Sequence, residues 1–348
     1  MHVALHLRRV TQRAIQTLGL AAALAWAGAA LAVVTVPATY ESEPGVRLAA
    51  TLELPDGAGS ARVPAVVLAV GAGPWGRGGY GALRARLHAA GIATLSYDKR
   101  GFGESTGAFD ESLPLVSRDV AAGVAYLRSR PDIDGRRIAL LGHSQGGGAL
   151  PRAAATAGGI AGVVIIAAPI GPRGEIFSAS MRRQLQASGM PTATADATVA
   201  ATSRWMDGRA RQLAVDELAP LREASISSFV AAGWRREQAE GAIASLDNPM
   251  LLSMYDAPLD EDLRRAGVPV LALYGGADTI VWPDVCVPAA SRALADHPDA
   301  LVMLVPGMGH GLERTTPIPA PAPGRLPEDA MSPVLVDAVH RWLVHHLR

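Results

Sequence analysis

The chain has 348 residues and a formal net charge of zero at pH 7; 49% of its residues are hydrophobic and 18% are charged. This balance excludes a disordered chain, and the scattered arginines with the single lysine, Lys99, form no basic stripe that would bind nucleic acid. The only cysteine, Cys286, excludes an intramolecular disulfide.

The N-terminal segment is typical of an export signal, because arginines precede an uncharged run rich in alanine and leucine from Leu18 to Val36. We expect residues 1–38 to be a signal peptide or an N-terminal membrane anchor of an exported protein, either periplasmic or secreted. Ala30-Leu31-Ala32 and Val36-Pro37-Ala38 both offer a signal peptidase small residues, whereas an uncleaved segment 14–36 would serve as a membrane tether. A buried N-terminal helix is the alternative.

The remaining chain, residues 39–348, alternates between predicted strands and helices. Residues 46–54 alternate between apolar and less apolar side chains, which predicts a half-exposed strand. Six short apolar runs predict strands buried on both faces: 65–70, 92–97, 138–141, 163–168, 268–274 and 301–305. Apolar residues at helical spacing lie between them, as in 116–127, and again near the C-terminus in 334–342. The alternation predicts an α/β fold, with a mostly parallel central sheet and helices on both faces, whose functional groups follow the carboxyl ends of the strands.

One long segment interrupts the alternation. Residues 172–260 are rich in alanine, arginine and glutamine and contain no convincing strand. We interpret the segment as an inserted helical cap, since long insertions at this edge of a sheet usually form lids or binding walls. A helical linker with no role at the site is the alternative.

A candidate nucleophile follows the predicted strand 138–141. The sequence Gly142-His143-Ser144-Gln145-Gly146 has the Gly-x-Ser-x-Gly pattern and leads into a predicted helix. A strand, a tight turn and a helix are what a nucleophile elbow requires, and the glycines permit the turn without a side-chain clash. We therefore predict Ser144 as the nucleophile, with a serine that only caps the helix as the alternative.

Two further residues stand where the partners of this serine belong. A serine hydroxyl needs a base, and the base needs an acid to orient it, in the chain order serine, acid, histidine. Asp278 follows the strand 268–274, and His310 follows the strand 301–305. Asp284, at the start of the next predicted helix, is the rival acid. Surface or packing positions are expected for the rival histidines, which are His143, His297, His345 and His346.

Acyl transfer also requires donors aimed at the oxyanion. These are normally the backbone N–H after the nucleophile and another from the loop after an early strand. We predict the N–H groups of Gln145 and of Ala72, the latter in the turn 71–74, although a glycine-rich turn without this role remains an alternative. Trp75 and His143 are candidates for the substrate pocket.

With these residues placed, the chain from about Tyr40 to its C-terminus resembles the bacterial α/β-hydrolase esterases that are also similar to serine aminopeptidases. Residues 97–107, Tyr-Asp-Lys-Arg-Gly-Phe-Gly-Glu-Ser-Thr-Gly, match the loop after the fourth strand of such esterases, and the surroundings of the predicted triad match as well. The resemblance implies that Asp98 and Arg100 anchor loops beneath the site, and that neither a cofactor nor a metal takes part. Residues 70–78 depart from the family, because they lack the histidine and two carboxylates that relatives often carry there.

These residues together predict a serine hydrolase that cleaves a small-molecule carboxylic ester through an acyl-enzyme. A peptidase, amidase or thioesterase would use the same triad, and a peptidase would need a site for the substrate amine. The predicted cap contains the carboxylates Glu175, Asp207, Asp216 and Glu217, which unpaired surface positions explain equally well. A non-catalytic binding protein that keeps the fold is the alternative from a different class.

Overall fold

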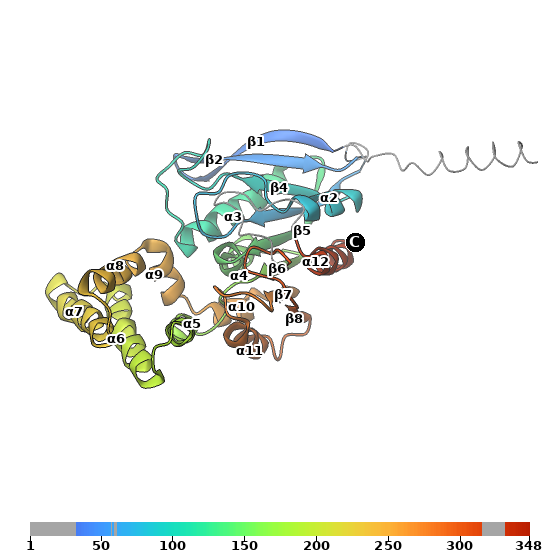
Figure 1. The fold of residues 1–348 in the computed structure, drawn as a ribbon. Helices are drawn as coiled ribbons and strands as arrows, with labels where there is room; N and C mark the ends of the chain where they lie inside the picture. The colour runs from blue at the N-terminus through green and yellow to red at the C-terminus, as the bar shows by residue number, and fades with distance from the viewer. Residues whose placement is uncertain (1–32, 57, 59–60, 315–330) are drawn as a thin grey trace, which may run out of the picture. The chain divides into compact units, whose positions relative to one another are not determined.

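The computed structural model describes residues 33–56, 58, 61–314 and 331–348. Within them, strands form one sheet in the order β1-β2-β4-β3-β5-β6-β7-β8 (Figure 1). The first two strands, β1 (Val34–Glu43) and β2 (Val46–Leu54), join the sheet antiparallel. The other strands pair in parallel and are β3 (Val63–Ala69), β4 (Ala93–Tyr97), β5 (Ile133–His143), β6 (Gly162–Ile166), β7 (Val270–Gly275) and β8 (Ala300–Val305). The predicted α/β fold with a mostly parallel sheet is confirmed.

Helices cover both faces of the sheet because successive side chains of its buried strands point in opposite directions. Val67 and Leu140 pack on the face covered by α3 (Leu113–Ser129), α4 (Gln145–Ala157), α10 (Leu259–Ala266) and α11 (Pro283–Ala293). Their neighbours Val66 and Leu141 pack on the other face, under α2 (Gly81–Ala89) and α12 (Pro333–His346). This burial on both faces explains why the central strands read as continuous apolar runs.

The chain between β6 and β7 contains five helices before α10, and we call this segment the helical insertion: α5 (Glu175–Ala187), α6 (Thr192–Ala210), α7 (Val215–Ala231), α8 (Arg236–Leu246) and α9 (Pro249–Asp256). It occupies the stretch in which we expected a cap. Trp205, Ile226 and Ile243 form part of an apolar core of its own. The Leu113 N–H donates to the Ser253 hydroxyl at 2.9 Å, which ties α9 to the start of α3.

The sheet begins earlier in the chain than the sequence indicated. We expected residues up to 38 to belong to a signal peptide or anchor, yet β1 starts at Val34. Its pairing with β2 runs from Val34, opposite Leu54, to Glu43, opposite Val46. Pro37 is tolerated because β1 is an edge strand, where a missing N–H need not break a ladder bond. The strand was missed because it directly continues the apolar run.

The N-terminal part of the predicted leader, residues 1–32, lies outside the described residues. Among the helices that are described, none is both long and apolar enough to cross a membrane.

Candidate active site

Ser144 lies in a sharp turn between a strand and a helix. β5 ends at His143, α4 begins at Gln145, and Ser144 between them has φ 54° and ψ −124°. A non-glycine residue in this region is strained, which is characteristic of residues held in place for function. A Cβ added to Gly146 would lie 2.4 Å from the Val70 carbonyl oxygen, and one added to Gly142 would lie 2.7 Å from the Gly146 carbonyl carbon. Both glycines are therefore required by close backbone approach.

The structure brings the three predicted triad residues together. His310 Nε2 lies 3.1 Å from Ser144 Oγ, and His310 Nδ1 lies 2.8 Å from Asp278 Oδ2. Asp278 is buried, and its other oxygen, Oδ1, accepts the N–H groups of Ile280 and Val281, each at 2.8 Å. A carboxylate fixed in this way accepts the Nδ1 proton of His310, so Nε2 is free to accept the serine proton.

The rival residues have other partners. Asp284 lies on α11 and forms an exposed ion pair with Arg183 of the insertion at 3.3 Å. His346 faces Asp299 at 3.2 Å and stacks on Trp342, and His345 meets the His346 ring edge-on. The ring nitrogen Nδ1 of His297 accepts the Asp299 N–H. Neither that acid nor those histidines reach Ser144.

His143 lies beside the triad rather than in the substrate pocket that we expected it to line. Its Nε2 is 2.7 Å from the His310 carbonyl oxygen, and the two rings are 4.8 Å apart. Burial, and after it the neighbouring His310, lowers the pKa of His143 to about 3. The neutral ring therefore donates Nε2–H to the His310 carbonyl and holds the segment that carries His310 against the elbow.

The turn after β3 packs against the elbow and is held at several points. Gly71 lies close to Ser144 and His143, and Ala72, Ser144 and Gln145 line one cavity. The Trp75 indole N–H donates to the Ala72 carbonyl at 2.6 Å. Trp75 is thus turned back onto its own loop and does not line the cavity as we expected.

Lys99 and Glu111 are residues near the site that the sequence interpretation missed. Lys99 Nζ lies 2.6 Å from both the Gly71 carbonyl oxygen and the Glu111 carboxylate, and 3.2 Å from Gln145 Oε1. Glu111 also accepts the Gly73 N–H at 2.8 Å. The only signal in the sequence was that the chain's single lysine stands in the loop after a predicted strand.

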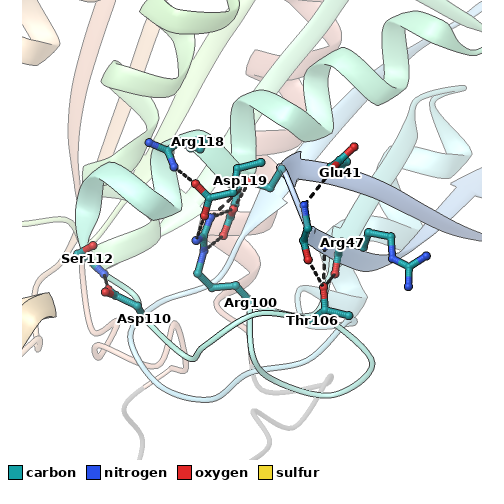
Figure 2. A network of polar contacts seen from close by, with 11 residues as sticks. Glu41, Arg47, Arg100, Thr106, Asp110, Ser112, Arg118 and Asp119 are labelled. Atoms are coloured by element: carbon teal, nitrogen blue, oxygen red, sulfur yellow. Dashed lines mark hydrogen bonds and ion pairs between the residues drawn. The ribbon is translucent and has the colours of Figure 1, made fainter.

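Asp98 and Arg100 flank Lys99 and anchor the surrounding loops. Asp98 Oδ1 accepts the Arg77 N–H at 2.7 Å and Asp98 Oδ2 accepts the Glu104 N–H at 3.0 Å, so this carboxylate holds the far end of the segment 70–78. Arg100 donates to both carboxylate oxygens of Asp119 on α3, at 3.0 Å and 2.6 Å (Figure 2). These contacts support the loops without reaching Ser144.

A cavity of about 240 Å³ opens beside Ser144, and its wall is mostly apolar. The helical insertion contributes Phe177, Met250 and Met254, while Ile280 and Val281 come from the loop that follows Asp278. No acidic or basic side chain belongs to the lining among the described residues. The volume is below the range of about 300–1,000 Å³ typical of pockets for drug-sized ligands, which suits a smaller apolar group.

Comparison with known proteins agrees with this architecture. Residues 66–320 match the model of the alpha/beta hydrolase family. The quorum-quenching protein AidA of Acinetobacter baumannii is 37% identical over 103 residues, which are 29% of this chain and 34% of that protein. The matched region thus spans about a third of the length of that curated relative.

Among the solved structures that share the fold at low sequence identity are Est1E and a proline iminopeptidase. Est1E from Butyrivibrio proteoclasticus, with ferulic acid bound, has a TM-score of 0.53 at 16% identity, covering 89% of this chain and 99% of that one. Proline iminopeptidase from Mycobacterium smegmatis has a TM-score of 0.52 at 18% identity, covering 90% and 99%. The family match over most of the chain confirms the resemblance seen in the sequence, and the chain belongs to the alpha/beta hydrolase family.

Proposed function

We propose that the protein is a serine hydrolase that cleaves carboxylic esters of small molecules. The observation that carries the proposal is the hydrogen-bonded series from Ser144 Oγ through His310 to Asp278, at a strained turn at the N-terminus of α4. A packing role would require neither this order of residues nor the strain at Ser144.

In the proposed reaction, Ser144 Oγ attacks the ester carbonyl carbon while His310 Nε2 takes the hydroxyl proton. The N–H groups of Ala72 and Gln145 stabilise the oxyanion of the tetrahedral intermediate. The intermediate collapses, His310 gives its proton to the leaving alcohol, and an acyl-enzyme remains. His310 then deprotonates a water molecule, which attacks the acyl carbon. The bond between the acyl carbon and Ser144 Oγ breaks, His310 returns its proton to Oγ, and the acid is released. Asp278 orients His310 and stabilises the imidazolium in both steps.

The character of the cavity favours an ester over a peptide. A peptidase that recognises a free amine needs a carboxylate near the scissile bond, and none belongs to the described lining. Asp207, considered for that role from the sequence, pairs with Arg173 at 2.8 Å, and Glu175 pairs with Arg292 at 3.3 Å. These carboxylates support the insertion and its contact with α11.

Substitution of the nucleophile tests the proposal. Ser144→Ala should abolish both the hydrolysis of p-nitrophenyl butyrate and labelling by a fluorophosphonate, while the circular dichroism spectrum stays unchanged. Ser227→Ala, on the exposed face of α7, is the matched control and should behave as the wild type. The anilide of the same acid should be cleaved far more slowly than the ester. Labelling that persists in Ser144→Ala would remove the assignment.

We also propose that the protein is exported and that any signal-peptidase cleavage follows Ala32 rather than Ala38. The support is that the second candidate site, Val36-Pro37-Ala38, falls inside β1, so cleavage there would remove half of a paired strand. The mass of the mature protein recovered from the producing cells distinguishes the two sites.

A further inference from the structure

Lys99 lies two residues after the end of β4 at Tyr97, and its side chain is buried; only 4% of the residue is exposed. Its ammonium group donates to three acceptors on three segments: the Gly71 carbonyl, the Glu111 carboxylate and the Gln145 side-chain oxygen. A lysine ammonium carries three N–H donors. All three donors can therefore be used: one on residues 71–74, which we call the oxyanion turn, one on Gln145 of the elbow, and one on Glu111 in the loop before α3.

The acceptor on the oxyanion turn has a chemical consequence. The Gly71 carbonyl and the Ala72 N–H belong to the same peptide group. A cation bound at 2.6 Å to the carbonyl oxygen draws electron density towards that oxygen and makes the N–H a stronger donor, since linked hydrogen bonds polarise one another. The positive charge thus acts on the oxyanion through the peptide group without touching the substrate.

Glu111 completes the arrangement and fixes the orientation of the turn. Its carboxylate accepts from Lys99 and from the Gly73 N–H, and its backbone carbonyl accepts from the Gln145 side-chain amide. The Gly73 N–H and the Ala72 carbonyl, which is bound by Trp75, are both occupied. Among the described residues, the Ala72 N–H has no protein acceptor, and Ala72 lines the cavity beside Ser144, so this N–H is available to a bound oxygen.

We propose that the Lys99–Glu111 ion pair is the positioning device of the oxyanion site, which orients the Ala72 and Gln145 N–H groups and strengthens the first of them. The inference rests on the proposed esterase function. The segment 70–78 itself contains no carboxylate, and this pair supports its turn from outside the segment, through the Gly71 carbonyl and the Gly73 N–H. Lys99 and Glu111 are positioning residues, because they act through the turn and not on the substrate.

The test replaces the pair without leaving a buried charge unpaired. The double variant Lys99→Met with Glu111→Gln removes both charges and keeps an acceptor for the Gly73 N–H, and such replacements are often neutral for stability. Loss of one oxyanion donor costs about 10²–10³ in kcat, so weaker and less fixed donors should lower kcat about 10- to 100-fold. KM for p-nitrophenyl butyrate should stay within about twofold, because the donors act mainly in the transition state.

The fluorophosphonate inactivation rate gives a second readout and should fall by a similar factor, since phosphonylation of Ser144 also develops charge on an oxygen. Lys99→Arg keeps the charge and should recover part of the rate. The matched control is Arg100→Met with Asp119→Asn, which removes the adjacent buried ion pair that does not touch the turn. That control should lower the melting temperature but leave the kcat of the folded protein within about twofold.

The outcomes separate the inference from the proposed function. A folded double variant with the kcat of the wild type, alongside an inactive Ser144→Ala, overturns the positioning role and leaves the esterase proposal standing. A raised KM at unchanged kcat also overturns it, because the pair would then contribute to substrate binding and not specifically to stabilisation of the transition state. Should the double variant not fold, Lys99→Arg decides, and a folded Lys99→Arg no faster than folded Lys99→Met refutes a role for the charge. A wild-type protein that neither hydrolyses the ester nor reacts with the probe overturns both proposals.

Discussion

Substitution of Asp278 by asparagine gives the sharpest test of the triad, because the structure determines how the new side chain must point. Asp278 Oδ1 accepts the N–H groups of Ile280 and Val281, each at 2.8 Å. An asparagine must place its carbonyl oxygen there, since its amide nitrogen cannot accept a hydrogen bond. The amide NH₂ group then faces His310 Nδ1, which must be unprotonated to accept from it. The proton moves to Nε2, and His310 can no longer take the proton of Ser144.

The expected loss of activity is therefore the loss caused by the wrong tautomer of His310. Such a change lowers kcat by about 10⁴, which corresponds to about 5 kcal/mol of transition-state stabilisation. Asp278→Asn should nevertheless be more stable than Asp278→Ala by about 2 kcal/mol, because alanine leaves the buried Val281 N–H and the partly buried Ile280 N–H without an acceptor. The asparagine variant should thus be the better folded of the two and no more active.

Steady-state hydrolysis of p-nitrophenyl butyrate and urea unfolding measure both quantities. Asp284→Asn is the matched control, since Asp284 forms only the exposed pair with Arg183 and should leave kcat within about twofold. Asp278→Asn with more than about a hundredth of the wild-type kcat, or Asp284→Asn with an equal loss, would refute the reasoning.

Three further predictions concern stability. The pKa of His143 is about 3 in the fold, below the unfolded value of about 6.5, so its contribution is present above about pH 6.5 and is lost as the pH falls towards 3. Because His143 is only half-buried, the wild type should lose only about 2 kcal/mol more than His143→Asn between pH 7 and pH 4.5 in urea unfolding, and equal losses would contradict a lowered pKa of this ring in the fold. Gly146→Ala should lower the free energy of unfolding by about 3 kcal/mol or more, because the new Cβ would meet the Val70 carbonyl oxygen at 2.4 Å. Gly241→Ala, whose Cβ meets nothing within 4 Å, should be neutral or stabilising in the same urea unfolding, and equal losses would contradict the steric argument. A chain that starts at Thr39 lacks the first half of β1, so its free energy of unfolding should be about 2 kcal/mol lower than that of a chain that starts at Val33, and its urea midpoint should be lower. Identical midpoints would show that this half of the strand contributes nothing to stability.

Much of the fold and of the candidate site could be predicted because it depends on residues that are close in sequence. The apolar runs of the central strands and the glycines around Ser144 act within a few residues of one another. The chain order of Ser144, Asp278 and His310, each directly after its own strand, follows from the rule that parallel strands end at one edge of the sheet. That rule predicts that the three side chains lie near one another.

Other features depend on contacts between distant segments. β1 could not be distinguished from the apolar run before it, because its assignment as a strand rests on pairing with β2 and on the burial of Tyr40. Trp75 was expected to line the pocket, yet a single hydrogen bond to the Ala72 carbonyl turns it back onto its own loop. A side chain's direction follows from its packing, which sequence spacing does not contain.

The sequence by itself determined the class of sheet, the family, and the serine and histidine of the proposed triad, with Asp278 preferred over Asp284 as the acid, because periodicity, turn glycines and the order of strand ends are properties of the chain. Only the tertiary structure decided that Asp278 rather than Asp284 meets His310, and that an apolar cavity lies between Ser144 and the insertion. It also placed the buried Lys99 within hydrogen-bonding distance of Gly71 and Glu111. The physical reason is the same in each case: these features arise where segments far apart in the sequence come within hydrogen-bonding distance, and no local pattern encodes that distance.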